Sequence, residues 1–166
     1  MILFLPIMIV VGIASKIVTG HVIFKQNRDG LKKKSFTMYK FSSIKPSWEY
    51  SKILNFIRSF GLDELPQLFN ILKGDMSFVG PRPFITGEKL PTMPNIKMYD
   101  VRPGVISLAT ANGRRVISHE KRLEYDLEYV DKVSFLLDMK IFFKSIAVII
   151  KQNTKGDIEG QVNRNT

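Results

Sequence analysis

Two acidic residues, Asp63 and Glu64, stand side by side near the middle of this 166-residue chain, ahead of a proline and an apolar helical pattern. Further along, Arg82 lies between Pro81 and Pro83, which restrict the backbone on both sides of the arginine. Carboxylates hold divalent cations, and a fixed guanidinium fork binds phosphate oxygens at little entropic cost. The two groups together are typical of metal-dependent phosphate chemistry.

Both groups also have a structural interpretation. Acidic residues in the first turn of a helix are common caps, because the unpaired amides and the helix dipole favour negative charge there. Arg82 can equally be a plain surface residue of a loop. Neighbouring residues in a helix point about 100° apart, so the two carboxylates would not share one task. One carboxylate could instead be a nucleophile and the other a metal ligand.

Several helices and short strands are expected to position these groups, which places the chain in the α/β class. Apolar residues at helical spacing predict helices over 51–60, 63–73, 118–130 and 134–151. Strands are predicted over 21–24 and 35–41 around an Asp-Gly turn, and within 77–83 and 99–115. The apolar face of the helix over 63–73 would be Leu65, Leu68, Phe69 and Leu72. Lys40 lies inside an apolar stretch, where its charge needs a partner.

The net charge of +10 indicates an anionic partner, which could be nucleic acid, anionic lipid or a phosphorylated substrate. The chain has no cysteine, which excludes disulfides, thiolate chemistry and Cys-ligated zinc. Neither a Walker loop nor a GxGxxG loop is present, which argues against an ordinary nucleotidase or dehydrogenase.

Residues 1–14 are apolar throughout but too short for a straight span, which needs about 20 residues, and Pro6 would bend a helix there. A signal peptide would lack its basic n-region, and a buried core helix is the simple alternative. We favour a membrane-inserted segment over 1–18, followed by a main domain over 19–151 and a polar tail over 152–166. Basic residues that would face anionic headgroups follow the apolar run over 1–14. They are Lys16, Lys25, Arg28, Lys32, Lys33, Lys34 and Lys40.

Six stretches of the chain resemble one known family. In order they are FKQNRDG, YKF, LDELPQLFNILKGDMSFVGPRP, VRPG, NGR and YVDKVSFLLDMKIFFKSI. They are similar to bacterial sugar transferases, the small monotopic phosphoglycosyl transferases that start glycan assembly on a polyprenyl phosphate. The short, single-domain members, such as the diacetylbacillosamine-phosphate transferase of bacterial N-glycosylation, are the most alike. The resemblance implies a membrane-associated monotopic domain, with a Pro-broken re-entrant helix and several helices at the membrane surface.

The resemblance also implies a reaction and a location. The family moves a sugar 1-phosphate from a UDP-sugar to undecaprenyl phosphate, releases UMP, needs Mg²⁺ and forms a covalent phosphosugar on an aspartate. It works at the cytoplasmic face of the bacterial inner membrane, as the first step of glycan, capsule, O-antigen or exopolysaccharide assembly. Carried onto this sequence, Asp63 is the nucleophile, Glu64 the metal ligand and Arg82 a phosphate-binding residue. Lesser candidates for the substrate's phosphates are Lys40, Arg58, Arg102 and Arg114.

The chain departs from the family pattern in three places. Pro6 fits the Ser-Pro break of the re-entrant helix, but Leu5 replaces the serine and only five residues precede the proline. The segment therefore matches the second half of a re-entrant hairpin, and either the start is misassigned or half the anchor is lost. Ser42 stands where a basic residue is usual. ISLATANGRR replaces the usual TGLxQVNGRN, so the glutamine expected near Thr110 is absent where we expect substrate contacts.

Three functions are therefore considered. The leading one is the membrane-bound sugar-phosphate transferase. The second is a non-catalytic, truncated member of the same family, which keeps the carboxylates but cannot hold its lipid substrate. The third, from a different class, is a basic nucleic-acid-binding module. It explains the net charge but neither the apolar amino terminus nor the carboxylates, and the sequence carries no RNA- or DNA-binding motif.

Overall fold

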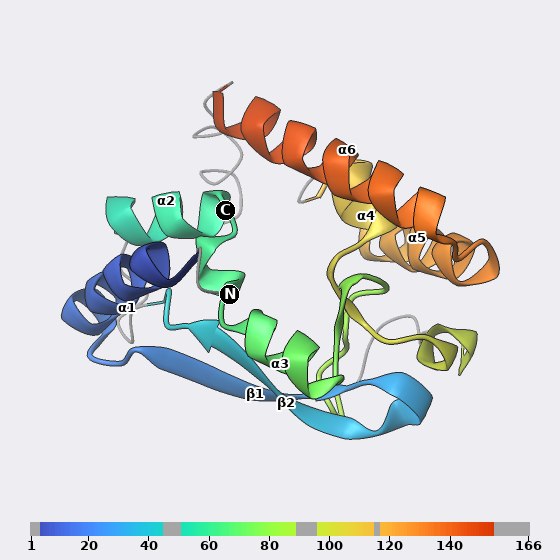
Figure 1. The fold of residues 1–166 in the computed structure, drawn as a ribbon, viewed down its shortest axis with the longest axis horizontal. Helices are drawn as coiled ribbons and strands as arrows, with labels where there is room; N and C mark the ends of the chain where they lie inside the picture. The colour runs from blue at the N-terminus through green and yellow to red at the C-terminus, as the bar shows by residue number, and fades with distance from the viewer. Residues whose placement is uncertain (1–3, 45–50, 89–95, 115–116, 155–166) are drawn as a thin grey trace, which may run out of the picture.

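The computed structural model describes residues 4–44, 51–88, 96–114 and 117–154. Its helices are α1 (Leu5–Thr19), α2 (Lys52–Ser59), α3 (Gln67–Lys73), α4 (Leu108–Ala111), α5 (His119–Asp131) and α6 (Phe135–Thr154). Its strands are β1 (Ile23–Asp29), β2 (Ser35–Phe41), β3 (Ser77–Val79) and β4 (Gly104–Ile106). Single 3₁₀ turns are η2 (Leu31–Lys33), η3 (Leu62–Glu64) and η4 (Ile96–Asp100). This mixture of helices and short strands confirms the α/β class (Figure 1).

The strands form two separate pairs. β1 and β2 are antiparallel, with Ile23 opposite Phe41 and Asp29 opposite Ser35. β2 has the predicted bounds, but β1 begins later than the predicted strand over 21–24 and continues to Asp29, because every residue of this stretch has a partner in β2. β3 and β4 are parallel. A Cβ on Gly104 would lie 2.1 Å from the amide nitrogen of Gly80, so these two backbones approach as only glycine allows.

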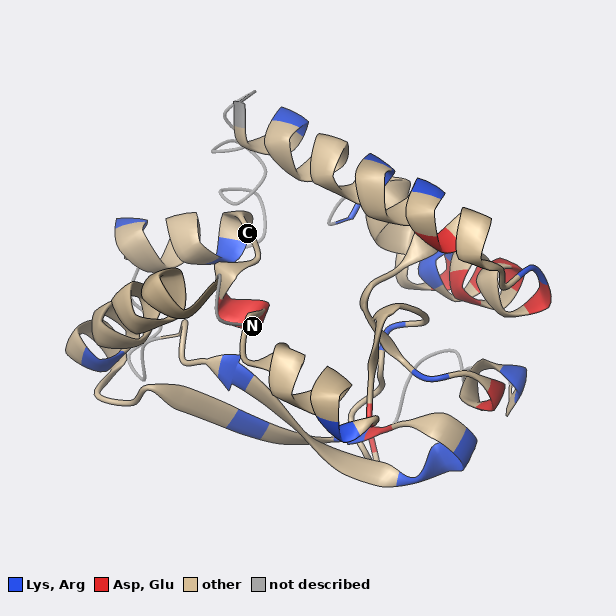
Figure 2. Cartoon of the chain, viewed as in Figure 1, with Lys and Arg blue, Asp and Glu red and all other residues tan. Residues whose placement is uncertain are grey.

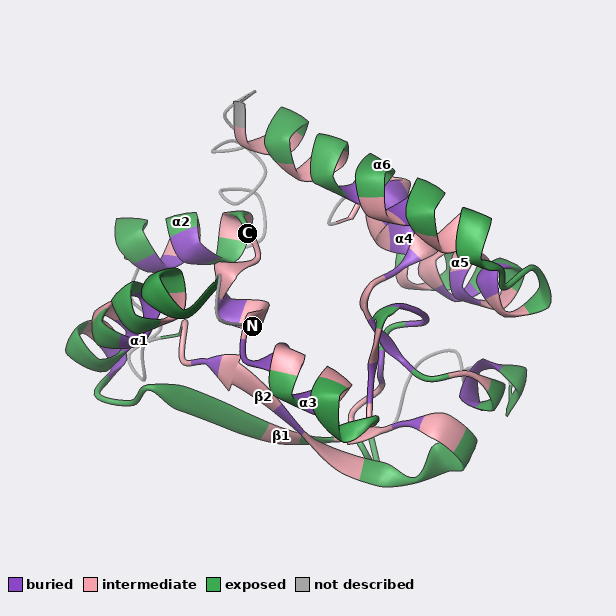
Figure 3. Cartoon of the chain, viewed as in Figure 1, coloured by how far each residue is buried: buried purple, intermediate pink, exposed green. Residues whose placement is uncertain are grey.

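The buried apolar side chains form two clusters. One cluster, from α1, β2 and α2, contains Val11, Phe41, Leu54 and Ile57. The other, from β3, α4, α5 and α6, contains Val79, Ala111, Tyr129 and Ile141. Helices α1 and α2 lie at one end of the molecule and α4, α5 and α6 at the other, with η3 and α3 between them (Figure 1). The inward sides of these elements are buried and their outward sides exposed (Figure 3).

Helix α1 runs without interruption and ends at Gly20, which has a φ of 80°. Pro6 lies in its first turn, where the missing N–H would have no helical partner in any case. The bend expected at Pro6 is therefore not seen within the described part of this segment. Among the described residues, no helix combines the length and the apolar character that a membrane crossing requires.

Two predictions about the other helices are wrong in part. In α3 the predicted apolar residues Phe69 and Leu72 are 44% and 70% exposed, whereas Gln67 and Asn70 are buried. The side of α3 that faces β2 is polar because the side chain of Asn70 bonds to the backbone of that strand. Helix α6 continues beyond residue 151, and the side chains of Gln152 and Asn153 donate to backbone carbonyls at 3.2 and 3.0 Å. The predicted tail therefore begins with helical residues, and 155–166 lie outside the described residues.

Candidate active site

Asp63 and Glu64 lie in η3, a 3₁₀ turn that precedes α3, and not in the first turn of the helix as predicted. Gly61 opens the turn with a φ of 72°, a conformation that favours glycine. Asp63 is buried and accepts a hydrogen bond of 3.2 Å from the hydroxyl of Ser43. Glu64 forms an ion pair of 2.7 Å with Lys40. The two carboxylates thus have different surroundings although they are neighbours in the chain.

These surroundings shift the two carboxyl groups in opposite directions. Burial raises the pKa of Asp63 and the adjacent charge of Glu64 raises it further, against the opposing effects of Lys40, the Ser43 hydrogen bond and Arg58. Burial also acts to raise the pKa of Glu64, but the charge and hydrogen bond of Lys40, aided by Arg82, outweigh it and lower this pKa. The ionised form of Glu64 is therefore favoured, and Asp63 is the more basic carboxylate of the two.

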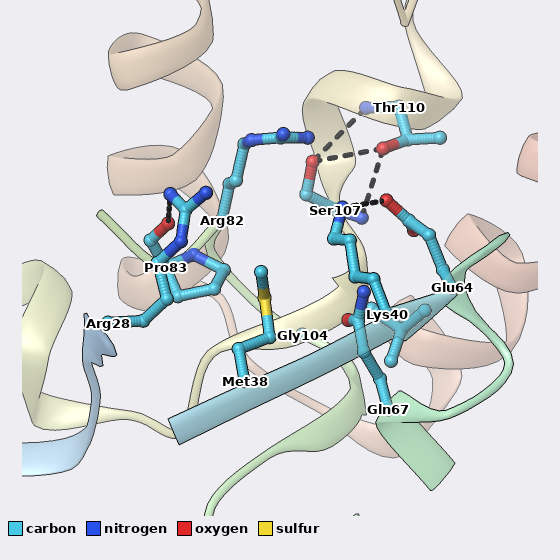
Figure 4. A pocket seen from close by; sticks show the side chains of 11 residues that line it. Arg28, Met38, Lys40, Glu64, Gln67, Arg82, Pro83, Gly104, Ser107 and Thr110 are labelled. Atoms are coloured by element: carbon cyan, nitrogen blue, oxygen red, sulfur yellow. Dashed lines mark hydrogen bonds and ion pairs between the residues drawn. The ribbon is translucent and has the colours of Figure 1, made fainter. Parts of the chain in front are cut away.

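A small, open pocket lies against Glu64. Figure 4 shows Arg28, Arg82 and Pro83 on one side of it, and Lys40, Glu64 and Gln67 on the other. The remaining lining residues are Met38, Gly104, Val105, Ser107 and Thr110. Burial and the neighbouring charge of Arg82 lower the pKa of Arg28 to about 10. Cations this close together favour an anionic ligand, so the pocket suits phosphate groups.

The backbone of the Pro-Arg-Pro loop is held by three other elements. The carbonyl of Pro81 accepts from an amide of β4 at 2.9 Å, and the carbonyl of Pro83 accepts from the Arg28 guanidinium of β1 at 3.1 Å. The amide of Arg82 donates to Oδ2 of Asp126 in α5 at 3.3 Å. The predicted rigidity of this loop therefore has a structural basis beyond the two prolines.

A side chain of α3 fixes β2 beside the carboxylates. Nδ2 of Asn70 donates to the carbonyl of Thr37 at 2.8 Å, and Oδ1 accepts from the amide of Tyr39 at 3.1 Å. Asn70 is fully buried, so it completes the hydrogen bonding of the strand edge as a third strand would. The next residue, Lys40, is thereby placed against Glu64, which is the partner that the sequence required for its charge.

The remaining predicted phosphate-binding arginines lie at helix ends. Nε of Arg102 donates to the carbonyl of Gly74 at 2.8 Å, after α3. The guanidinium of Arg114 donates to the carbonyls of Arg58 and Ser59, in the last turn of α2. Helix carbonyls at these positions have no partner within the helix. Arg58, Arg102 and Arg114 are absent from the described lining of the pocket, and their contact with the substrate's phosphates stays a prediction.

Sequence reasoning misplaced or missed several residues of the site. Arg28 was expected to face lipid headgroups with the other basic residues, but it lines the pocket and bonds to Pro83. Its position within FKQNRDG, one of the stretches that carry the resemblance, was the available signal. Ser43 and Asp126 were also missed. Asp126 stands three residues from each of the buried Leu123 and Tyr129, a spacing that places all three on one face of α5.

The described residues contain no cluster of three or more acidic or histidine side chains that could form an all-protein metal cage. Mg²⁺ usually binds proteins through one or two carboxylates, and takes its other ligands from water and substrate phosphates. The adjacent carboxylates of Asp63 and Glu64 are donors of this kind, next to a pocket that suits phosphates. The site therefore fits a metal that arrives with, or is completed by, its substrate.

Comparison with known proteins is consistent with this site. A family model described as bacterial sugar transferase matches residues 1–152. The chain is 41% identical over 142 residues to an uncharacterized sugar transferase of Bacillus subtilis, EpsL, a match that covers 78% of this chain and 70% of the relative. It is 38% identical over 169 residues to a UDP-glucose:undecaprenyl-phosphate glucose-1-phosphate transferase of Klebsiella pneumoniae. This match covers 88% of this chain and 36% of the relative.

A further relative is an undecaprenyl-phosphate galactose phosphotransferase of Salmonella typhimurium, which is 32% identical over 163 residues. This match covers 81% of the present chain and 34% of the relative. The chain thus spans most of the length of the Bacillus protein and about a third of the length of the other two.

Proposed function

The chain belongs to the bacterial sugar transferase family, and from this membership and the geometry of the pocket we propose that it transfers a sugar 1-phosphate from a UDP-sugar to undecaprenyl phosphate. Two relatives carry this type of reaction in their names, with glucose 1-phosphate and galactose phosphate as the groups transferred. The observation that carries the proposal is the convergence of Lys40, Glu64 and Arg82 on one pocket beside Asp63. Such a pocket offers cations to a diphosphate. Asp63 is buried and does not itself line the described pocket, so its part as nucleophile rests on its place next to Glu64 in the chain.

In the proposed reaction, a carboxylate oxygen of Asp63 attacks the phosphorus that bears the sugar. The bond from this phosphorus to the oxygen of UMP breaks, and UMP leaves with the electron pair. A phosphate oxygen of undecaprenyl phosphate then attacks the same phosphorus and releases the carboxylate of Asp63. The raised pKa of Asp63 supports its role as nucleophile, and Lys40 and Arg82 would offset the charge that develops on the phosphate oxygens.

We include Mg²⁺ in the proposal, since the adjacent carboxylates fit a metal that substrate phosphates complete. When bound, the ion would neutralise charge on the diphosphate. Glu64 is the residue expected to hold it, because its lowered pKa keeps it ionised in the working pH range. Arg28 and Arg82 would orient the diphosphate from the opposite side of the pocket.

We also propose a place at the cytoplasmic surface of the bacterial inner membrane, as the family resemblance implies. Exposed apolar side chains support contact with a membrane surface. They belong to three helices: Leu5, Ile9, Val10, Ile13 and Ile17 of α1, Ile53 and Phe56 of α2, and Phe135, Leu136, Phe143, Ile146 and Ile150 of α6. Helix α6 also carries Lys140, Lys144 and Lys151 along its length (Figure 2), and Lys144 donates to Oδ1 of Asn112 at 2.7 Å. An amphipathic helix of this kind can lie in the interface, with its lysines reaching the headgroups. Pro6, in the first turn of α1, would lie within the inserted part.

The experiment that tests the function is UMP release by the membrane-reconstituted protein with undecaprenyl phosphate, Mg²⁺ and a panel of UDP-sugars. Release beyond one equivalent of UMP per protein should require the lipid, because the lipid frees Asp63 for the next cycle. All release should disappear in Asp63→Asn, which cannot form the acyl phosphate. Ser43→Ala, which removes only a hydrogen bond to the same carboxylate, should keep measurable turnover. Undiminished turnover in Asp63→Asn would overturn the covalent mechanism. Silence of a folded, membrane-bound wild-type protein across the panel would favour the non-catalytic member of the family.

A further inference from the structure

We infer that Asp126 is a positioning residue, which holds the Pro-Arg-Pro loop so that Arg82 faces the substrate's phosphates. This inference rests on the proposed function, since it assigns a role to the loop that binds substrate. Asp126 lies on α5, is completely buried and does not line the described pocket. It acts through the backbone of Arg82, whose amide lies 3.3 Å from Oδ2.

The Arg82 amide is the one backbone N–H donor in the Pro81-Arg82-Pro83 tripeptide. Pro81 and Pro83 have no backbone N–H, so a neighbouring element can fix the loop by accepting a hydrogen bond only at Arg82. Asp126 takes that bond, while the carbonyls on either side are held by β4 and Arg28. The backbone of Arg82 is thereby fixed from three directions, and the direction in which its side chain leaves the loop is fixed with it.

A carboxylate at this place is costly for the fold, which argues that it has a task. Oδ1 of Asp126 is buried and makes no hydrogen bond within the described structure. A buried carboxylate with an unsatisfied oxygen is less favourable than an apolar side chain of similar size. The next buried position of the same face, Tyr129, is satisfied by Asp138 at 2.7 Å and contacts the carbonyl of Val79 at 3.4 Å. Helix α5 therefore holds β3 through Tyr129 and the loop after it through Asp126.

Two charged groups face Asp126, namely Arg122 on the same helix and Arg82 itself. Both favour its ionised form, as does the amide bond, whereas burial disfavours that form and raises the pKa of Asp126 to about 7. Arg82 also lowers the pKa of Arg122, after the larger effect of burial. Both arginines are therefore near enough to influence the charge of Asp126, although its hydrogen bond goes to the backbone of Arg82 and leaves the guanidinium available to the pocket.

The test is a double-mutant cycle between Asp126 and Arg82, read by the Kd for UDP and by kcat/KM. Asp126→Leu should weaken UDP binding about 10- to 100-fold, the loss expected when a buried charged hydrogen bond is removed. Asp126→Asn keeps an acceptor oxygen for the amide and should restore most of the affinity. In an Arg82→Ala background, Asp126→Leu should have almost no further effect on the Kd for UDP or on kcat/KM. Glu124→Leu, an acidic-to-leucine change on the exposed side of α5, is the matched control.

A second readout does not depend on turnover. Hydrogen exchange of the Arg82 amide should be slow in the wild-type protein and in Asp126→Asn, and fast in Asp126→Leu. If Asp126→Leu does not fold, Asp126→Ser, which shortens the side chain and admits water, takes its place in the cycle. Additive losses of Asp126→Leu and Arg82→Ala, or an Asp126→Asn protein as weak as Asp126→Leu, would overturn the inference. A wild-type protein that binds UDP and protects the amide but releases no UMP would instead overturn the proposed function alone.

Discussion

The ammonium group of Lys40 lies 2.7 Å from Oε1 of Glu64, and this contact joins the end of β2 to the turn that carries Asp63. The two side chains are only 17% and 27% exposed, so water weakens their interaction less than it would at the surface. The pair keeps Glu64 ionised and at the same time places a cation on the wall of the pocket. It links the strand pairing of the hairpin directly to the chemistry of the carboxylates.

Lys40→Met should lower kcat/KM for the UDP-sugar at least about tenfold, because a partly buried charged hydrogen bond is lost and Glu64 becomes easier to protonate. The measurement is initial UMP release as a function of UDP-sugar concentration. Lys73→Met is the control, since Lys73 is exposed and its ammonium group contacts the hydroxyl and ring of Tyr39, away from the carboxylates. Equal activity of the two variants would contradict the role given to the ion pair.

Asn70→Asp should destabilise the fold by about 1–3 kcal/mol, because an acceptor replaces the donor that faces the Thr37 carbonyl and the carboxylate of Asp75. Thermal or urea unfolding would measure the change. Asn27→Asp is the matched control on β1: its Oδ1 already accepts from the Thr37 hydroxyl at an exposed position, so the new carboxylate keeps the bond. A similar loss of unfolding free energy in both variants would show that the added negative charge is responsible, and not the loss of the Asn70 hydrogen bonds to β2.

Arg82→Gln and Arg102→Gln should separate substrate binding from helix capping. Arg82 lines the pocket, so its loss should raise KM for the UDP-sugar with little change in the free energy of unfolding. Arg102 donates to the carbonyl that follows α3, so its loss should lower stability by about 1 kcal/mol and leave KM near that of the wild type. A raised KM in Arg102→Gln would instead restore the phosphate-binding role predicted for it.

Asp126→Asn should change how stability depends on pH. Burial raises the pKa of Asp126 to about 7, above its ordinary value, so the contribution of this group is fully present below the unfolded pKa and is lost as pH rises through about 7. Between pH 4 and 8 the wild type should lose up to about 4 kcal/mol relative to Asp126→Asn. Urea unfolding of both proteins across this range measures the difference. Parallel curves would mean that Asp126 titrates near its ordinary pKa in the fold.

The sequence alone predicted the elements that local patterns determine. β2, α2 and the Ser118 cap of α5 were placed within a residue or two, because their apolar spacing and caps are local signals. Lys40 was predicted to need a partner, and Glu64 is that partner. The carboxylates and Arg82 were singled out from their chemistry and neighbours, and the fold brings Glu64 and Arg82 to one pocket.

What could not be predicted depends on contacts between distant segments. Asn70 and Gln67 lie on the buried side of α3. Asn70 bonds to the backbone of β2, and Gln67 lines the pocket; both places exist only because β2 lies beside the helix. In the sequence Arg28 is one of several basic residues. In the structure β1 continues to Asp29, and this places the Arg28 guanidinium against the carbonyl of Pro83. Spacing places Asp126 on the buried face of α5, but the reason for a carboxylate there is the Arg82 amide, which comes from a distant segment.

The pocket lies between the two apolar clusters, with Lys40 and Glu64 near the first and Ser107 and Thr110 near the second. A ligand that contacts both sides is therefore linked to the folding of both clusters, since its binding free energy is lost when either one unfolds. At a hundredfold excess over its Kd such a ligand adds about 2.7 kcal/mol to the free energy of unfolding. A bound ligand of this kind would therefore couple the two clusters and favour their unfolding together.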